Sequence, residues 1–163
     1  MPLLSGFHFL NVRSGTRIKF GVLDHVELGN MDSKRDWGHS KDYVRAMWLM
    51  LQQDKPDDYV IATNETRTVR EFVETAFAHA GITVEWQGRG VDEIGIDKAT
   101  GKTIVSVNKK FFRPAEVDVL LGNPAKAETV LGWKREISFS DLVERMVKND
   151  LALVEHELKC QNV

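Results

Sequence analysis

The chain has 163 residues, of which 42% are hydrophobic and 28% charged, a balance typical of a folded globular domain and not of a disordered chain. Its 22 basic and 24 acidic residues give a net charge of −2 without any basic block, so general electrostatic binding to nucleic acid or to an anionic membrane is not expected. The single cysteine, Cys160, excludes an internal disulfide, no residue spacing predicts a metal site, and no stretch reaches the ~20 apolar residues of a membrane span. We therefore expect a cytoplasmic protein.

The first part of the chain shows few periodic signals. Residues 1–16 repeat at neither helical nor strand spacing and predict a loose leader. Residues 17–21 are expected to end a helix at Gly21, and residues 22–28 to form a short strand closed by Gly29 and Asn30.

A polar segment followed by an amphipathic helix comes next and is the first candidate for a ligand-binding wall. Ser40 is expected to cap a helix over residues 41–53 that buries one apolar face. That face consists of Val44, Met47, Trp48 and Leu51. Trp37 suits a strand or its edge, so Arg35 would lie beside a strand-to-helix junction, where a guanidinium can bind a phosphate through two parallel hydrogen bonds.

Two features of this segment also have a plainer interpretation. Lys34, Arg35 and Asp36 can instead form a solvated turn with a local ion pair. His39 could act as a base, but a single histidine near a helix start is more often a structural residue that makes a hydrogen bond. The sequence alone leaves these alternatives open.

The middle of the chain is predicted to alternate strands and helices. The expected elements are a buried strand over residues 59–62, a helix that the capping box Thr68-Val-Arg-Glu71 opens and Gly81 ends, and strands over residues 82–86 and 103–107. Four glycines predict a mobile excursion over residues 88–101. That excursion lacks the glycine spacing and the strand-to-helix setting of a phosphate loop.

A second polar cluster occupies residues 111–118. Pro114 holds Arg113 in an extended conformation. Arg35 and Arg113, with Glu116 close to the latter, suit a nucleoside diphosphate, because guanidinium groups bind phosphates and a carboxylate binds ribose hydroxyls. The alternative is an internal ion pair between Arg113 and Glu116 that braces a loop.

The C-terminal part is predicted to be helical. Asn123 and Pro124 start a short helix that closes at Gly132, and Ser138 opens a long last helix. The tail, residues 156–163, is expected to fray. The tryptophans Trp48, Trp86 and Trp133 are most simply core or rim aromatics, and Trp133 stands where a docking aromatic is expected.

Five segments together carry a family signature. They are Leu28-Gly-Asn-Met-Asp-Ser-Lys-Arg-Asp-Trp-Gly-His-Ser-Lys-Asp-Tyr-Val44, Tyr59-Val-Ile-Ala-Thr63, Thr68-Val-Arg-Glu-Phe-Val73, Phe112-Arg-Pro-Ala-Glu-Val-Asp118 and Leu131-Gly-Trp-Lys134. In this order they closely resemble the GDP-mannose 4,6-dehydratases of the extended short-chain dehydrogenase/reductase superfamily, over about residues 17–151.

The resemblance implies a mixed α/β fold, namely the small substrate-binding domain of such an enzyme with the Rossmann half absent. The GDP-sugar-binding domain would occupy residues 17–155, and residues 1–16 would be a divergent leader of a truncated or alternatively started product. The site residues that the resemblance implies are Arg35 and Arg113 at the pyrophosphate of GDP-mannose, Glu116 at the ribose, and Lys34 and Asn30 nearby.

The family reaction is a lyase reaction that converts GDP-mannose to GDP-4-dehydro-6-deoxymannose, a step toward GDP-fucose, with NADP as the hydride carrier. The family's glycine-rich turn, catalytic threonine and glutamate, and Tyr-x-x-x-Lys pair have no counterpart in this sequence. We therefore expect a substrate-binding part without catalytic residues or an NADP site of its own. The alternative is a non-catalytic sugar-nucleotide-binding or subunit-interaction module that pairs with full-length dehydratase subunits or with itself.

Overall fold

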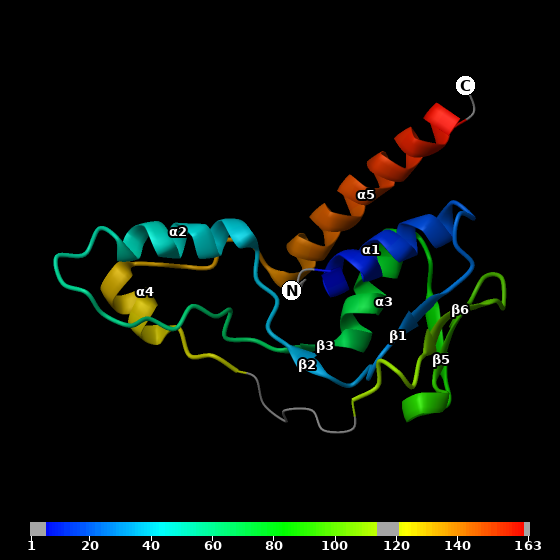
Figure 1. Ribbon diagram of the computed structural model, residues 1–163, viewed down its shortest axis with the longest axis horizontal. Coiled ribbons are helices and arrows are strands. Elements are labelled where there is room, and N and C mark those ends of the chain that lie inside the picture. Colours follow the sequence, from blue (N-terminus) through cyan, green and yellow to red (C-terminus); the bar gives the residue numbers. More distant parts are fainter. Residues whose placement is uncertain (1–5, 114–120, 162–163) are drawn as a thin grey trace. The chain divides into compact units, whose positions relative to one another are not determined.

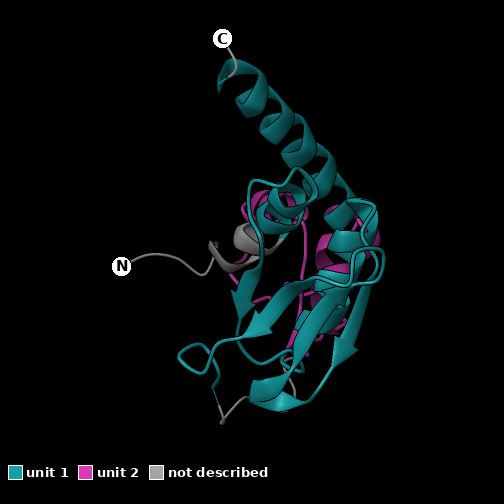
Figure 2. Cartoon of the chain, turned by 90° about the vertical axis from the view of Figure 1, so that its right-hand side faces the viewer, with its two compact units in different colours: residues 1–33, 69–116, 143–163 teal, residues 34–68, 117–142 magenta. Residues whose placement is uncertain are grey.

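The computed structural model describes residues 6–113 and 121–161, with side chains described from residue 12 onward. The chain divides into two compact units, coloured separately in Figure 2. Unit 1 comprises residues 1–33, 69–116 and 143–163, and unit 2 comprises residues 34–68 and 117–142. The mixed α/β class predicted from the sequence is confirmed, since both units contain helices and strands.

The sheet of unit 1 has four strands in the order β1-β6-β5-β4. These strands are β1 (Val26–Leu28), β4 (Val84–Gln87), β5 (Ile94–Asp97) and β6 (Thr103–Val107). β1 and β6 are parallel, whereas β4, β5 and β6 form an antiparallel meander. The mobile excursion expected over residues 88–101 is therefore wrong in part, because it contains the 3₁₀ turn η1 (Gly90–Asp92) and the whole of β5. The glycines of this segment predict a loop, but pairing with β4 and β6 stabilises β5 as a strand.

Helices α1 (Gly6–Lys19) and α3 (Val69–His79) lie side by side in unit 1 (Figure 1). α3 begins one residue after Thr68, where the capping pattern placed its start. It ends as predicted, because Gly81 has a φ of +82° and its N–H donates to the carbonyl of Ala78 while the N–H of Ile82 donates to that of Phe77. These two bonds satisfy carbonyls that the end of a helix would otherwise leave without a donor.

The expectation of a loose leader over residues 1–16 is wrong for its described part, which belongs to α1. Val12 and Thr16 are fully buried, and Gly15 allows close contact with the ring of Phe77 on α3. The buried face of α1 includes the small residues Ser14 and Gly15, so it carries little hydrophobic periodicity. Packing against α3, rather than an apolar stripe in the sequence, explains the helix.

Helix α5 (Phe139–Gln161) opens at Ser138 as predicted, since the hydroxyl of Ser138 accepts a hydrogen bond from the N–H of Asp141. Within unit 1 it buries Val143, Val147 and Val154 at helical spacing. The frayed tail expected from residue 156 is wrong, because the helix continues to Gln161. An (i, i+4) ion pair between Glu155 and Lys159 supports this end.

Unit 2 contains the short antiparallel strands β2 (Lys34–Arg35) and β3 (Arg67–Thr68) and the helices α2 (Ser40–Met50) and α4 (Ala125–Leu131). α4 closes at Gly132 in the left-handed conformation, as predicted. The hydrophobic core of unit 2 is formed by Ala46, Ala127, Leu131 and Trp133. Trp133 docks as expected, because its indole N–H donates to the backbone carbonyl of Asp42 at 2.8 Å.

Helix α2 differs from its prediction in both its cap and its buried face. The cap is His39, whose Nδ1 accepts a hydrogen bond from the N–H of Lys41, so the structural alternative for this histidine is the one observed. The face expected to be buried is instead exposed: Val44, Met47, Trp48 and Leu51 are 61%, 60%, 59% and 82% exposed.

The orientation of α2 is fixed by polar contacts that hydrophobic periodicity cannot reveal. The buried carboxylate of Asp42 accepts hydrogen bonds from the backbone N–H groups of Glu136 and Ile137. These bonds and the close packing of Ala46 turn this side of the helix toward the core of unit 2. The strand predicted over residues 59–62 belongs to neither of the two described sheets, because strand propensity does not supply a neighbouring strand.

Candidate functional site

The parallel pair β1 and β6 directs two candidate segments to one end of the unit 1 sheet. Leu28 is in register with Val107, and both strands end there, so the loops that follow leave from neighbouring carboxyl ends. The first loop carries Asn30 and the second leads to Arg113. Loops at the carboxyl ends of parallel strands are where ligands commonly bind in α/β sheets.

The two loops are in direct contact. The N–H of Asn108 donates to the carbonyl of Leu28 at 2.8 Å. A Cβ atom on Gly29 would lie 2.5 Å from the backbone oxygen of Phe111, so only glycine permits this close approach. The fold thus places the segments of Asn30 and Arg113 together, although these residues are 83 positions apart in the sequence.

Asn30 is held in a turn. Its side-chain Oδ1 accepts a hydrogen bond from the N–H of Asp32 at 3.0 Å. The side-chain amide nitrogen carries two further donor positions, which suits contact with an acceptor on a ligand. Arg113 is exposed at the end of its loop, where its guanidinium can reach solutes.

Arg70 at the start of α3 stabilises the turn that contains Asn30 through two hydrogen bonds. Its backbone N–H donates to the carbonyl of Met31, and its guanidinium donates to the carboxylate of Asp32 at 2.8 Å. The same guanidinium makes a bidentate contact with the buried carboxylate of Glu93, and these contacts raise the pKa of Arg70. Arg70 was not predicted as a site residue, and its pairing with Glu93 could not be read from the sequence.

Lys34 and Arg35 form strand β2 in unit 2, so they are not the solvated turn of the alternative interpretation. Successive side chains of a strand point to opposite faces, so Lys34 and Arg35 do not face the same way. Arg35 lies opposite Arg67 on β3, and Lys34 lies opposite Thr68. The register that brings Arg67 opposite Arg35 could not be read from the sequence, because it is a tertiary property.

A polar cluster surrounds the β2–α2 junction in unit 2. One carboxylate oxygen of Asp36 accepts a hydrogen bond from the N–H of Thr63 at 2.8 Å. Burial, and next the negative charges of Asp36 and Asp42, raise the pKa of Tyr43 above its ordinary value. Tyr43 is therefore a protonated structural phenol at neutral pH rather than a base.

Glu116 lies outside the described residues. Whether it pairs with Arg113 or is available to a ligand thus stays a prediction.

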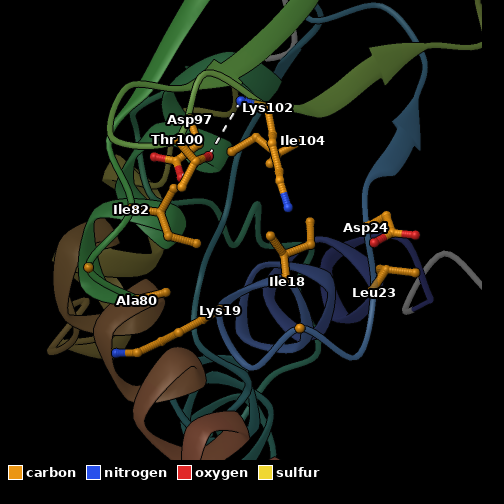
Figure 3. Close-up of a pocket in the computed structure, with 12 residues that line it drawn as sticks. Ile18, Lys19, Leu23, Asp24, Ala80, Ile82, Asp97, Thr100, Lys102 and Ile104 are labelled. Carbon is orange, nitrogen blue, oxygen red and sulfur yellow. Dashed lines mark hydrogen bonds between the residues drawn. The ribbon is translucent and has the colours of Figure 1, made fainter.

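Unit 1 also contains a surface cavity of about 310 Å³, shown in Figure 3. It lies where α1 and α3 end, and residues of the β5–β6 hairpin line its other side. Its apolar floor includes Ile18, Ile82 and Ile104, and the Lys102 side chain extends into it. None of Asn30, Lys34, Arg35 or Arg113 lines this cavity, so it is separate from the predicted site.

Cofactor and metal chemistry can be tested against the described residues. Gly88 follows β4 and Gly90 opens η1, so both lie in the connection of the antiparallel pair β4 and β5, whereas a dinucleotide-binding turn joins a strand to the N-terminus of a helix. This glycine-rich stretch does not fit NADP. Residues 6–113 and 121–161 contain no group of three or more His, Cys, Asp or Glu side chains placed to hold a metal ion.

The family model for GDP-mannose 4,6 dehydratase matches residues 10–146. The chain belongs to the GDP-mannose 4,6-dehydratase family. It is 53% identical to the GDP-mannose 4,6-dehydratase of Sinorhizobium fredii (strain HH103) over 140 residues, which cover 86% of this chain and 40% of the relative. It is 52% identical to the human GDP-mannose 4,6 dehydratase over 142 residues, covering 87% of this chain and 38% of that one. The chain thus spans about 40% of the length of these curated relatives.

The dehydratase match begins within α1, earlier than the sequence motifs indicated. Among solved structures, RMD from Pseudomonas aeruginosa complexed with NADPH is similar with a TM-score of 0.70 at 19% identity, over 90% of this chain and 43% of that one. At this identity the likeness shows only that the two chains share a fold over the matched residues. In the part of the chain that the structure describes, no helix has the length and apolar character needed to cross a bilayer.

Proposed function

We propose that the chain supplies the GDP-sugar-binding part, residues 17–155, of a cytoplasmic GDP-mannose 4,6-dehydratase, a lyase that forms GDP-4-dehydro-6-deoxymannose. The observation that carries this proposal is the contact between the loops of Asn30 and Arg113 at the carboxyl ends of β1 and β6. Family membership supports the substrate class, and the free, exposed thiol of Cys160 fits a reducing compartment.

The proposed roles follow the chemistry of each side chain. Arg35 and Arg113 bind the phosphates of GDP-mannose through charge-assisted hydrogen bonds, and Glu116 accepts hydrogen bonds from the ribose hydroxyls. Asn30 and Lys34 add single donors nearby. These groups hold the substrate by its nucleotide, and binding energy at such a remote group can be used to orient the sugar for reaction.

We further propose that the chain by itself does not turn over GDP-mannose. Hydride transfer needs a bound oxidant, which is NADP in the family, and the described glycine-rich stretch does not fit that cofactor. No residue of this chain is assigned a catalytic role, so the chemistry would depend on groups from other dehydratase chain segments.

A thermal-shift titration tests the proposal, because a ligand that binds only the folded state raises stability with its concentration over its Kd. GDP-mannose and GDP are expected to raise the melting temperature of the chain, whereas NADPH and mannose alone leave it unchanged. An unchanged melting temperature at millimolar GDP-mannose would refute the binding role. Formation of the 4-keto sugar by the purified chain with added NADP would refute the absence of turnover.

The second candidate function, a subunit-interaction module, is favoured by the exposed face of α2. Val44, Met47, Trp48 and Leu51 form a continuous apolar stripe, and such stripes on soluble proteins mark interaction surfaces. We propose that this stripe contacts a full-length dehydratase subunit or a second copy of the chain. Two measurements distinguish these partners. Co-purification of the chain with a tagged full-length relative would indicate contact with a full-length subunit, and a dimer in a purified sample of the chain alone would indicate contact with a second copy.

A further inference from the structure

Arg70, at the start of α3, contacts the turn that carries Asn30. Its backbone N–H donates to the carbonyl of Met31 at 3.0 Å, and its Nη2 donates to the carboxylate of Asp32 at 2.8 Å. The N–H of Asp32 donates in turn to Oδ1 of Asn30 at 3.0 Å, so that oxygen is used within the turn. These contacts determine where the amide N–H groups of Asn30, its donors to a ligand, can point.

The guanidinium of Arg70 is also bound to the strand pair from which the second loop of the proposed site follows. Both of its terminal nitrogens donate to the buried carboxylate of Glu93, with 3.0 Å between Nη2 and Oε2. The backbone carbonyl of Glu93 accepts a hydrogen bond from the N–H of Val107, the last residue of β6, at 3.3 Å. The loop that carries Arg113 begins directly after Val107. Arg70 is therefore connected to both loops of the proposed site.

The surroundings of Arg70 make this connection rigid. A guanidinium is planar and its N–H groups have fixed directions, so the carboxylates of Asp32 and Glu93 cannot shift independently while both are bound. The ring of Trp86 lies against the guanidinium, 5.0 Å from Cζ to the ring centroid, and the indole N–H of Trp86 is itself bound to Glu74 at 2.7 Å. The side chain of Arg70 is only 24% exposed, so water and salt screen its ion pairs less than those of an open surface.

We propose that Arg70 is a positioning residue for nucleotide binding, which together with Glu93 orders the Asn30 turn and the loop of Arg113 before a ligand binds. Loops that are ordered in advance lose less conformational freedom on binding, so the affinity rises without any contact between Arg70 and the ligand. The role in binding rests on the proposed function. The ordering of the two loops is a property of the chain without a ligand and is tested separately.

The first test is amide hydrogen exchange of the full chain without a ligand, comparing the wild type with Arg70→Lys. Lysine keeps a positive charge beside Glu93 but loses the fork that binds two carboxylates at once. The amides of residues 32–33 and 108–112 are expected to exchange about tenfold faster or more, as for the loss of a charge-assisted hydrogen bond, while those of α5 are unchanged. Unchanged exchange in both loops would overturn the proposal.

The matched control for this test is Arg17→Lys. Arg17 is another arginine of unit 1, and its ion pair with Glu157 joins α1 to α5. This substitution should leave the exchange of residues 32–33 and 108–112 unchanged. An equal increase in both variants would mean that any lost arginine contact loosens unit 1, and the positioning role of Arg70 would be wrong.

The second test is isothermal titration of Asp32→Ala with GDP. This variant keeps the buried Arg70–Glu93 pair and removes only the ion pair to the turn. GDP binding is expected to weaken about threefold to tenfold, because the turn must then be ordered on binding. Charge alone would act in the opposite direction, since removing a carboxylate favours an anionic ligand. The control Glu85→Ala removes an exposed carboxylate of the same unit and should stay within about twofold.

A double-variant cycle tests whether Asp32 acts through Asn30. In the background of Asn30→Ala, the further change Asp32→Ala should have little additional effect on the Kd of GDP, because the group that it positions is already absent. A loss as large as in the wild type would mean that Asp32 contacts the ligand itself, and the positioning role would be wrong.

The outcomes distinguish the positioning role from the proposed function. If the chain binds GDP and the affinity of Asp32→Ala stays within about twofold of the wild type, the positioning role is wrong and the proposed function stands. If the chain does not bind GDP but both loops exchange faster in Arg70→Lys, the proposed function fails together with the binding role of Arg70, and the ordering of the loops stands.

Discussion

The guanidinium of Arg70 holds the carboxylate of Glu93 through both of its terminal nitrogens, with Glu93 only 5% exposed. The ring of Trp86 lies against the same guanidinium, 5.0 Å from Cζ to the ring centroid. A single residue thus connects the start of α3, the Asn30 turn and the entry to β5 in unit 1. Such a buried, bidentate pair is costly to break from one side, because the remaining charge stays buried without compensation.

Arg70→Met is expected to lower the free energy of unfolding by about 3–5 kcal/mol, the cost of leaving a buried carboxylate uncompensated. Urea unfolding monitored by tryptophan fluorescence measures it. The matched control is Lys98→Met, whose ion pair with Glu85 is exposed on both sides, so its loss should leave the free energy of unfolding almost unchanged. Equal effects of the two substitutions would show that the Arg70–Glu93 pair does not stabilise unit 1.

Arg113→Ala should weaken GDP binding far more than Arg89→Ala. Both side chains are exposed, so neither change should alter the core. Arg113 ends the loop that contacts the Asn30 segment, whereas Arg89 precedes η1 in the meander. A lost charge-assisted hydrogen bond costs about 1.5–3 kcal/mol, which calorimetry with GDP detects readily. Similar affinities of the two variants would remove Arg113 from the proposed site.

Trp48→Gln on the exposed stripe of α2 is expected to reduce association of the chain by about tenfold or more, because buried tryptophans commonly carry a large share of interface energy. Sedimentation velocity over a concentration series measures the change. Leu153→Gln serves as the control, since Leu153 is also exposed but belongs to α5 and is not one of the stripe residues. A wild-type chain that stays monomeric at every concentration would contradict self-association through this surface.

The pH dependence of stability should reveal Asp150. Burial raises the pKa of its carboxyl above the ordinary value, so the folded state binds this proton more tightly than the unfolded state. The contribution to stability is full below the unfolded pKa and is lost as pH rises through the folded pKa. Asp150→Asn should therefore raise stability at about pH 7, with a smaller gain or none at about pH 4, as measured by urea unfolding at both pH values.

The exposed Glu155 on the same helix provides a control of opposite sign. A hydrogen bond from Lys159 lowers its pKa, so its favourable contribution is present above the unfolded pKa and is lost in acid. Glu155→Gln should not raise stability at neutral pH. A gain for Glu155→Gln equal to that for Asp150→Asn would point to a general charge effect on α5 instead of burial.

The sequence by itself determined those features whose physical cause is local. Gly81 and Gly132 end their helices because these positions require a left-handed backbone, and Ser138 opens α5 because its hydroxyl bonds a nearby N–H. β6 was predicted over residues 103–107 from its branched side chains. The family was also readable, since its motifs are contiguous segments of the chain.

Only the tertiary structure decided which surfaces and pairs these elements form. α2 has apolar residues on more than one side, and the bonds to Asp42 and the packing of Ala46 select the face that is buried. α1 forms although its buried side has little periodicity, because close packing on α3 stabilises it. The Asn30 and Arg113 loops meet because β1 and β6 are parallel neighbours, and Arg67 faces Arg35 because of strand register. Each of these depends on contacts between residues far apart in the chain, which local propensity and spacing do not encode.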